Sequence, residues 1–205
     1  MKLPSFRLVP AAIACGFVLA AGSALAINAG SAAPDFAVAD VHGKTVRLSD
    51  YRGKFVVLEW TNPDCPFVRA QYGADAMQAA QKEATGKDVV WLTINSTNQR
   101  NGEFKTGAQM DQWMQGRNAA PSVILIDPTS ATARAYDAKT TPHMFVIDPK
   151  GTIVYAGAID DKRSARESDR KTAHNYVRAA LGEAIAGKPV TVASTTPYGC
   201  SLKYD

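Results

Sequence analysis

Short apolar runs alternate with longer amphipathic stretches along the middle of this chain. The runs are rich in β-branched residues, and their continuous apolar character is typical of strands covered on both faces. We expect such buried strands at Lys54–Trp60, Asp88–Asn95 and Val123–Ile126. Helical patterns occupy Pro66–Thr85 and Ala108–Gly116, and proline suits the first position of the former.

The ends of the chain carry weaker patterns. Phe36–Val46 alternates loosely around His42-Gly43-Lys44, which predicts a hairpin. Two further strands, Met144–Ile147 and Thr152–Ala158, flank the favourable turn sequence Asp148-Pro149-Lys150-Gly151. We also expect a helical turn at Ala131–Tyr136, a mobile charged loop at Asp160–Lys171, a helix at Thr172–Ala186 with Thr172 as its N-cap, and an irregular tail at Lys188–Asp205.

This order of elements indicates the fold class. A strand–helix–strand unit is followed by a helix-containing connection, a β-hairpin and a final helix. Such an order predicts an α/β domain with a central mixed sheet and helices on both faces. The sequence shows no internal repeat, and its length suffices for one domain with a full core.

The first 26 residues differ from the rest. A basic start precedes an apolar run at Val9–Ala21, and Ala24-Leu25-Ala26 fits a small-residue cleavage site. This pattern predicts a secretory signal peptide at residues 1–26, with a retained N-terminal anchor as the alternative. We therefore expect a periplasmic or secreted protein, cleaved near Ala26 and without stable membrane insertion after processing. Its domain would span 27–187, and a tail would span 188–205.

Composition and charge exclude several classes of function. The formal net charge of +4 includes Lys2 and Arg7 of the leader, so the remainder is close to neutral. We find no aromatic–basic array for nucleic acid, no phosphate-binding glycine loop and no Ser/His/Asp pattern, and we expect no nucleic acid partner and no cofactor. Because Cys15 lies in the leader, Cys65 and Cys200 remain in an oxidising compartment, where two thiols can pair.

Cys65 is the residue that points most directly to chemistry. It follows a predicted buried strand and directly precedes Pro66 and the predicted helix. A helix N-terminus carries partial positive charge and free N–H groups, and both stabilise a thiolate. The thiolate is the reactive form of cysteine, so this position predicts redox chemistry.

Four segments between Ala33 and Gly187 carry a family resemblance. They are Ala33-Pro34-Asp35-Phe36 with Leu48–Lys54 behind it, the strand into Cys65-Pro66-Phe67-Val68, Thr140-Thr141-Pro142, and the hairpin Phe145–Gly151. Together they resemble the thioredoxin-like superfamily, and within it the redoxin branch of peroxiredoxin-like, thiol-specific-antioxidant-type proteins. The resemblance implies a thioredoxin-like fold and thiol chemistry.

The chain also departs from the cysteine motifs of thioredoxins and of peroxiredoxins. Val68 stands where thioredoxins carry the second cysteine of Cys-x-x-Cys. Peroxiredoxins carry Pro-x-x-x-Thr/Ser-x-x-Cys, whereas this chain has Leu58 at the proline position and Asn62 at the hydroxyl position. The hydroxyl that orients peroxide is therefore missing, and Cys65 matches the first cysteine of the thioredoxin motif.

The resemblance implies further site residues. Pro142 matches the cis-proline loop that faces the active thiol, and Thr141 would offer its backbone to an extended peptide. With Pro66, these two are the expected substrate-binding residues. Glu59 lies six residues before Cys65, as does the buried acid of thioredoxins, and burial would raise its pKa enough for proton exchange. The alternative for Glu59 is a strand-end carboxylate that finds water or an arginine.

Cys200 follows Pro197-Tyr198-Gly199 in the bent tail. We interpret it as a resolving cysteine that returns to Cys65, with a static disulfide or a free thiol as alternatives. A cluster of Cys65, His143 and Cys200 that binds Cu(I) is a further, non-catalytic alternative, and we expect no other metal site.

The sequence thus predicts an extracytoplasmic thiol–disulfide oxidoreductase that acts through Cys65 and is resolved by Cys200. Its partners would be protein or small-molecule thiols and disulfides, together with an unidentified reductant. One alternative is a thiol peroxidase, in which peroxide oxidises Cys65 to a sulfenic acid and Cys200 condenses with it. The other alternative is a non-enzymatic binding module or copper carrier.

Overall fold

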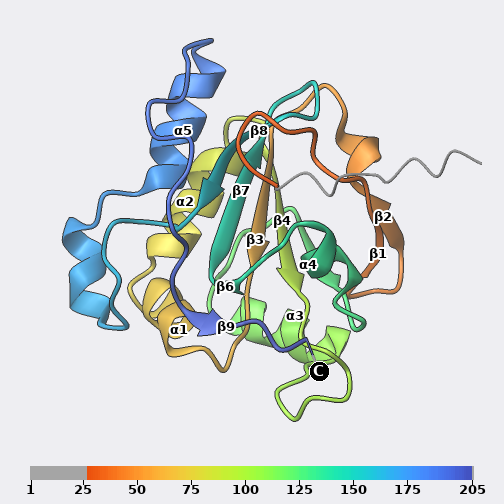
Figure 1. Cartoon of the computed structure of the whole chain (residues 1–205). Coiled ribbons are helices and arrows are strands. Elements are labelled where there is room, and N and C mark those ends of the chain that lie inside the picture. The colour runs from red at the N-terminus through yellow and green to blue at the C-terminus, as the bar shows by residue number, and fades with distance from the viewer. Residues whose placement is uncertain (1–26, 205) are drawn as a thin grey trace, which may run out of the picture.

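The structure is a computed structural model that describes residues 27–204, and it is built around one mixed β-sheet (Figure 1). The strands of this sheet are β1 (Ala37–Asp40), β2 (Thr45–Arg47), β3 (Val56–Trp60), β4 (Val90–Asn95), β5 (Val123–Ile126), β7 (His143–Ile147) and β8 (Ile153–Gly157). They are arranged in the order β2-β1-β5-β4-β3-β7-β8. The inner strands β3, β4 and β5 run parallel, whereas the outer pairs are antiparallel. Two short strands, β6 (Thr140–Thr141) and β9 (Cys200–Ser201), pair separately.

Helices cover both faces of the sheet, which confirms the predicted architecture (Figure 1). The helices are α1 (Pro66–Gly73), α2 (Ala76–Thr85), α3 (Gly107–Gly116), α4 (Ala131–Ala135) and α5 (Tyr176–Ile185), with short 3₁₀ helices η1 (Leu48–Tyr51) and η2 (Glu167–Thr172). Side chains of α1, α2, α3 and α5 share one buried cluster, and those of η1 and α4 share the other. No helix within residues 27–204 is long and apolar enough to cross a bilayer. The leader predicted at 1–26 lies outside the described residues.

Strand β3 divides the core because its side chains alternate between the two faces. Leu58 and Trp60 face the cluster beneath α4, where the Trp60 ring centroid lies 5.4 Å from that of Phe145. Val57 faces the cluster on the other side, together with Cys65. The carboxyl end of β3 therefore delivers the chain to Cys65 on the face covered by α1, α2, α3 and α5.

The helix predicted over Pro66–Thr85 is wrong, because the structure contains two helices there. Asp75 adopts a left-handed conformation with φ of 56°, which ends one helix and starts the next. Gly73 marks the same break, since a Cβ at that position would lie 2.1 Å from Oε1 of Glu167. The Gln78 side chain spans the break by donating a hydrogen bond to the carbonyl oxygen of Tyr72 at 2.8 Å.

Three predictions for the C-terminal part are also corrected. The charged stretch Asp160–Lys171 is anchored rather than mobile, because it contains η2 and the buried side chains of Asp160 and Arg170. The N-cap of α5 is Asn175, whose Oδ1 accepts a hydrogen bond from the N–H of Arg178 at 2.9 Å. The tail is ordered at its end, where β9 pairs with β6. The Asn175 cap is a local contact, whereas the Asp160–Arg170 pair and the β6–β9 pairing join residues that local pattern does not connect.

The position of the α5 cap yields a stability prediction. Asn175→Ala removes the side-chain acceptor at the helix start and should lower the free energy of unfolding by about 1 kcal/mol. Thr172→Ala is the matched control, because Thr172 is exposed and does not cap the helix, so its effect should stay within about 0.5 kcal/mol. Urea unfolding of both variants provides the measurement. An equal loss in the two variants would contradict the cap assignment.

Candidate functional site

Cys65 lies at the start of α1, as the sequence predicts. It is the N-cap residue, and Pro66 occupies the first helical position. The backbone N–H of Cys65 donates to the carbonyl oxygen of Asn62 at 3.0 Å, which closes the turn after β3. The Sγ atom donates to the carbonyl oxygen of Thr141 at 3.0 Å. Only 1% of the residue is exposed, so the thiol is covered in this conformation.

The cover is the C-terminal tail. In the antiparallel pair β6–β9, Cys200 lies opposite Thr141. Gly199 packs directly on the Thr141–Pro142 peptide bond, which is cis as expected. A Cβ on Gly199 would lie 2.0 Å from the carbonyl oxygen of Thr141, and the φ of Gly199 is +138°, so glycine is required at this close approach. Figure 1 shows the blue tail descending from α5 to β9, beside β6.

This pairing brings the two thiols together, although they are far apart in sequence. Both cysteines meet at Thr141, because the Thr141 carbonyl oxygen accepts from Cys65 Sγ and Thr141 is the strand partner of Cys200. Both cysteines are free thiols here, and Cys200 is half-buried at the rim of the site. Burial, followed by the hydrogen bond and the charge of Cys65, raises the pKa of the Cys200 thiol. The raised pKa favours the thiol form of Cys200.

The three residues predicted to bind substrate differ in exposure. Pro66 is exposed beside the thiol site. Thr141 and Pro142 are buried, and the backbone of Thr141 already pairs with Cys200. Binding of an external peptide at Thr141 stays a prediction, and it requires that β9 leave β6.

Glu59 is fully buried on the same face of β3 as Val57. Its carboxylate accepts hydrogen bonds from Tyr72 Oη at 2.8 Å, Gln81 Nε2 at 3.1 Å, Trp91 Nε1 at 2.8 Å and Thr93 Oγ1 at 2.9 Å. Burial raises the pKa of Glu59, and these four hydrogen bonds oppose the rise. Neither water nor arginine is needed to satisfy this carboxylate.

A hydrogen bond from Tyr72 links Glu59 to α1, the helix that begins at the thiol site. Tyr72, which donates to Glu59, belongs to the helix that Cys65 caps. Among the described residues, none of the four hydrogen-bond partners of Glu59 is a cysteine. A role for Glu59 in proton exchange stays a prediction.

Asn62 occupies the position where peroxiredoxins carry a hydroxyl, and its side chain is fully engaged. Its Nδ2 donates to Oε2 of Glu103 at 2.9 Å, and its Oδ1 accepts from the N–H of Asp64 at 2.8 Å. Asp64 in turn forms ion pairs with Lys105 at 2.6 Å and Arg69 at 3.2 Å. These contacts fix the turn before Cys65.

The copper alternative finds no support in the described residues. His143 projects from β7 toward Phe145, whereas Met144, between them, joins the cluster that contains Cys65. The Nδ1 atom of His143 accepts from the N–H of Lys139, and burial lowers the pKa of His143 to about 4. Within residues 27–204, no three His, Cys, Asp or Glu side chains are grouped to hold a metal ion.

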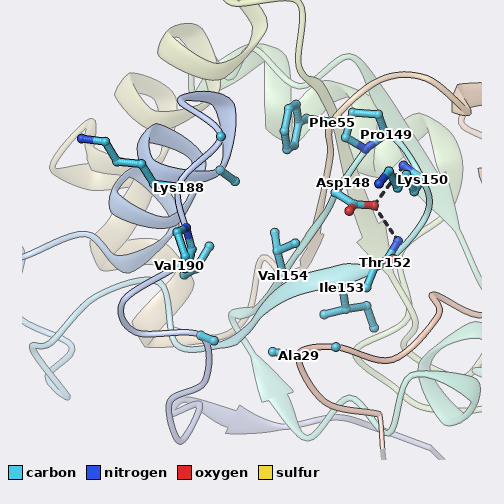
Figure 2. A pocket seen from close by; sticks show the side chains of 15 residues that line it. Ala29, Phe55, Asp148, Pro149, Lys150, Thr152, Ile153, Val154, Lys188 and Val190 are labelled. Atoms are coloured by element: carbon cyan, nitrogen blue, oxygen red, sulfur yellow. Dashed lines mark hydrogen bonds between the residues drawn. The ribbon is translucent and has the colours of Figure 1, made fainter.

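One pocket lies far from Cys65, and another adjoins the turn before it. Figure 2 shows one of about 720 Å³ between the tail and β8, lined by Val154 and Val190 among others. Phe55, at its edge, precedes β3, whereas Cys65 follows that strand, so this pocket lies at the opposite end of the sheet. A pocket of about 330 Å³ adjoins the turn before Cys65, between Pro63 and Trp113 of α3.

The residues that sequence reasoning missed are those that anchor the tail. They are Gln71 of α1, Asp160, Arg170 of η2 and Tyr198. The only sequence signal was the position of Tyr198, two residues before Cys200. The contact of Asp160 with Arg170 carries no recognisable motif.

The model of the AhpC/TSA family matches residues 29–156. The thiol–disulfide oxidoreductase ResA of Bacillus subtilis is 28% identical over 128 residues, which are 62% of this chain and 66% of that protein. Peroxiredoxin Bcp of Bacillus subtilis is 26% identical over 113 residues, or 55% of this chain and 66% of that protein. The chain thus spans slightly less than two thirds of the length of these two relatives.

The fold also matches a solved structure. An uncharacterized conserved protein from Geobacillus kaustophilus superimposes with a TM-score of 0.76 at 27% sequence identity, covering 87% of this chain and 93% of that one. The predicted thioredoxin-like fold is confirmed. The family match ends at residue 156, so the segment that carries Asp160, Arg170, Tyr198 and Cys200 lies beyond it.

The buried position of Glu59 yields a pH prediction. Its pKa is raised in the folded protein, so the carboxyl stabilises the fold most when it is protonated. This contribution is fully present below the unfolded-state pKa of about 4.3 and is lost as the pH rises through the folded-state value. Wild type should therefore lose stability relative to Glu59→Gln as the pH rises, by at most about 1.4 kcal/mol per pH unit.

Urea unfolding of both proteins between about pH 4 and about pH 8 measures this difference. The amide that replaces the carboxyl in the variant does not titrate, so the variant's curve supplies the reference. Parallel stability curves would show that the four donors hold the pKa at its unfolded value.

Proposed function

The chain belongs to the AhpC/TSA family, and on that premise we propose that it is a thiol–disulfide oxidoreductase whose redox pair is Cys65 and Cys200. The observation that carries this proposal is the placement of both cysteines against Thr141, which the β6–β9 pairing brings about. The relationship to ResA supports the same class of reaction. Proteins of this class exchange thiols and disulfides, and we assign the same partner chemistry to this chain.

The proposed reaction has two steps. The Cys65 thiolate attacks one sulfur of a partner disulfide, which breaks the partner's S–S bond, forms a mixed disulfide and releases one partner thiolate. Cys200 then loses its proton and attacks the Cys65 sulfur, which releases the second partner thiolate and forms the Cys65–Cys200 disulfide. Two electrons pass from the protein to the partner, and an external dithiol reductant returns them.

The geometry assigns a distinct part to each cysteine. Cys65 caps α1, so the helix N-terminus favours its thiolate both as an attacking and as a leaving group. Cys200 replaces the second cysteine of Cys-x-x-Cys, since Val68 occupies that position and is fully buried. Because Cys65 is covered, a protein partner must displace β9 before it reaches the Cys65 sulfur.

The predicted leader places this reaction outside the cytoplasm. Residues 1–26 carry the signal-peptide pattern, and an oxidising compartment is where a protein disulfide persists. We therefore propose that the protein is extracytoplasmic and that its leader is cleaved near Ala26.

Peroxide reduction is the second candidate, supported by the family and by the relationship to peroxiredoxin Bcp. Against it stands the engagement of Asn62 with Glu103 and Asp64, which leaves no hydroxyl beside Cys65 at the usual position.

The central prediction is that Cys65 and Cys200 form one reversible intramolecular disulfide. Oxidised protein should lose two thiols per chain and regain them with dithiothreitol, because the sulfurs are already neighbours. Cys200→Ser should accumulate mixed disulfides through Cys65, since no second thiol resolves them. Intact mass and non-reducing peptide mapping provide the measurement, with Cys65→Ser as the matched control. Two free thiols after oxidation, or intermolecular dimers alone, would reject the pair.

The second prediction separates the two candidate reactions. Reduced protein should react at least about tenfold more slowly with hydrogen peroxide than with an activated small disulfide, because Asn62 offers no hydroxyl to orient the peroxide beside Cys65. Stopped-flow tryptophan fluorescence with each oxidant gives the two rate constants. Faster oxidation by peroxide would make the peroxidase the preferred function.

A further inference from the structure

The tail reaches the thiol site through a buried anchor at Tyr198. Its hydroxyl donates to Oδ1 of Asp160 at 2.5 Å and accepts from Nη1 of Arg170 at 2.9 Å. Only 5% of Tyr198 is exposed, and the side chains of Arg170 and Asp160 are 1% and 3% exposed. Charge-assisted hydrogen bonds of this kind are about twice as strong as neutral ones.

Asp160 and Arg170 are themselves held in place. Nη1 of Arg170 contacts both carboxylate oxygens of Asp160, at 2.8 and 3.1 Å. Nη2 of Arg170 donates to the carbonyl oxygens of Lys162 and Ser164, and the N–H of Lys162 donates back to Asp160. The pair is thus a rigid acceptor and donor for the tyrosine hydroxyl.

The anchor is connected to the helix that Cys65 caps. Nε2 of Gln71, in α1, donates to Oδ2 of Asp160 at 2.6 Å. The Phe67 ring, also in α1, meets the Tyr198 ring edge to face, with centroids 5.8 Å apart. Tyr198 is therefore positioned relative to the same helix that positions Cys65.

Three consecutive tail residues are fixed by three different contacts. Tyr198 contacts the buried ion pair, Gly199 packs on the Thr141 carbonyl, and Cys200 meets Cys65. A buried ion pair rarely adds net stability over apolar packing, because both charges lose their hydration. Its position here, two residues from Cys200, indicates a role in the geometry of the tail.

We propose that Tyr198 is a positioning residue of the thiol site: held by the Asp160–Arg170 pair, it docks the tail so that Cys200 meets Cys65 and covers it. This inference rests on the proposed function for its redox readout. The contact of Tyr198 with the Asp160–Arg170 pair then has two linked effects. Docking raises the effective concentration of Cys200 at Cys65, and it lowers the access of other molecules to Cys65.

Tyr198→Phe tests the first effect while it retains the ring and its contact with Phe67. The equilibrium converts the protein dithiol and one oxidised glutathione into the protein disulfide and two reduced glutathiones. Its constant should fall about tenfold in the variant, which loses a charge-assisted hydrogen bond. Thiol alkylation followed by mass spectrometry gives the ratio of reduced to oxidised protein.

The second effect is measured in the Cys200→Ser background, where only Cys65 can react. Adding Tyr198→Phe should raise the rate of Cys65 alkylation by iodoacetamide about tenfold, because the undocked tail no longer covers the sulfur. Tyr176→Phe is the matched control. Within residues 27–204 the Tyr176 hydroxyl has no hydrogen-bond partner, and its ring stacks on that of Tyr155 with centroids 6.4 Å apart.

Gly199→Ala supplies an independent perturbation of the same docked state. Its Cβ would collide with the Thr141 carbonyl, so it should shift both readouts in the same directions as Tyr198→Phe. A merely structural tyrosine would lower the melting temperature and leave both readouts within twofold of Tyr176→Phe. That result would overturn the proposal.

The two proposals fail in different ways. If wild type forms no Cys65–Cys200 disulfide at any glutathione ratio, the redox pair is rejected. The alkylation rates in the Cys200→Ser background still decide the docking role of Tyr198. An unchanged alkylation rate with an intact, reversible disulfide rejects the docking role alone.

Discussion

The proposed redox chemistry depends on the pairing of β9 with β6, because this pairing holds Cys200 opposite Thr141. Only two residue pairs form it, and a strand pair of this length is not stable by itself. It persists because residues on both sides of Cys200 are anchored. Tyr198 contacts Asp160 and Arg170 before it, while Leu202 is buried in the core and Tyr204 donates to the Ala138 carbonyl after it.

In the proposed reaction, this arrangement separates two tasks that a Cys-x-x-Cys motif combines in one helical turn. The first thiol stays at the helix start, where backbone N–H groups and the helix dipole favour the thiolate. The second thiol arrives from the far end of the chain, and the docked tail reduces the entropy that its approach would otherwise cost. A partner that requires the Thr141 edge competes directly with the tail for that edge.

The interior beneath the site contains a buried polar network around Glu59. Glu59 is buried among four donors from α1, α2 and β4, and Gln81 is itself oriented because its Oε1 accepts from the N–H of Ala120. Such a network ties the helix of Cys65 to the centre of the sheet through Tyr72. The helix that carries Cys65 is thus also held by contacts that do not involve the tail.

The sequence by itself determined the sheet, the helix start at Cys65 and the turn at Asp148–Gly151, because each depends on hydrophobic period or on turn chemistry within a few residues. It also identified Cys200 as a candidate resolving cysteine, and this role stays a prediction. It could not place Asp75 in a left-handed conformation, move the α5 cap to Asn175 or order the Asp160–Lys171 stretch. The cap at Asn175 is a local contact, whereas the stretch is ordered by the buried contact of Asp160 with Arg170, which lies ten residues further along the chain. Only the tertiary structure brought Asp160, Arg170 and Gln71 around Tyr198, and buried Cys65 beneath the tail, because charge pairing and close packing act through space and leave no periodic trace in sequence.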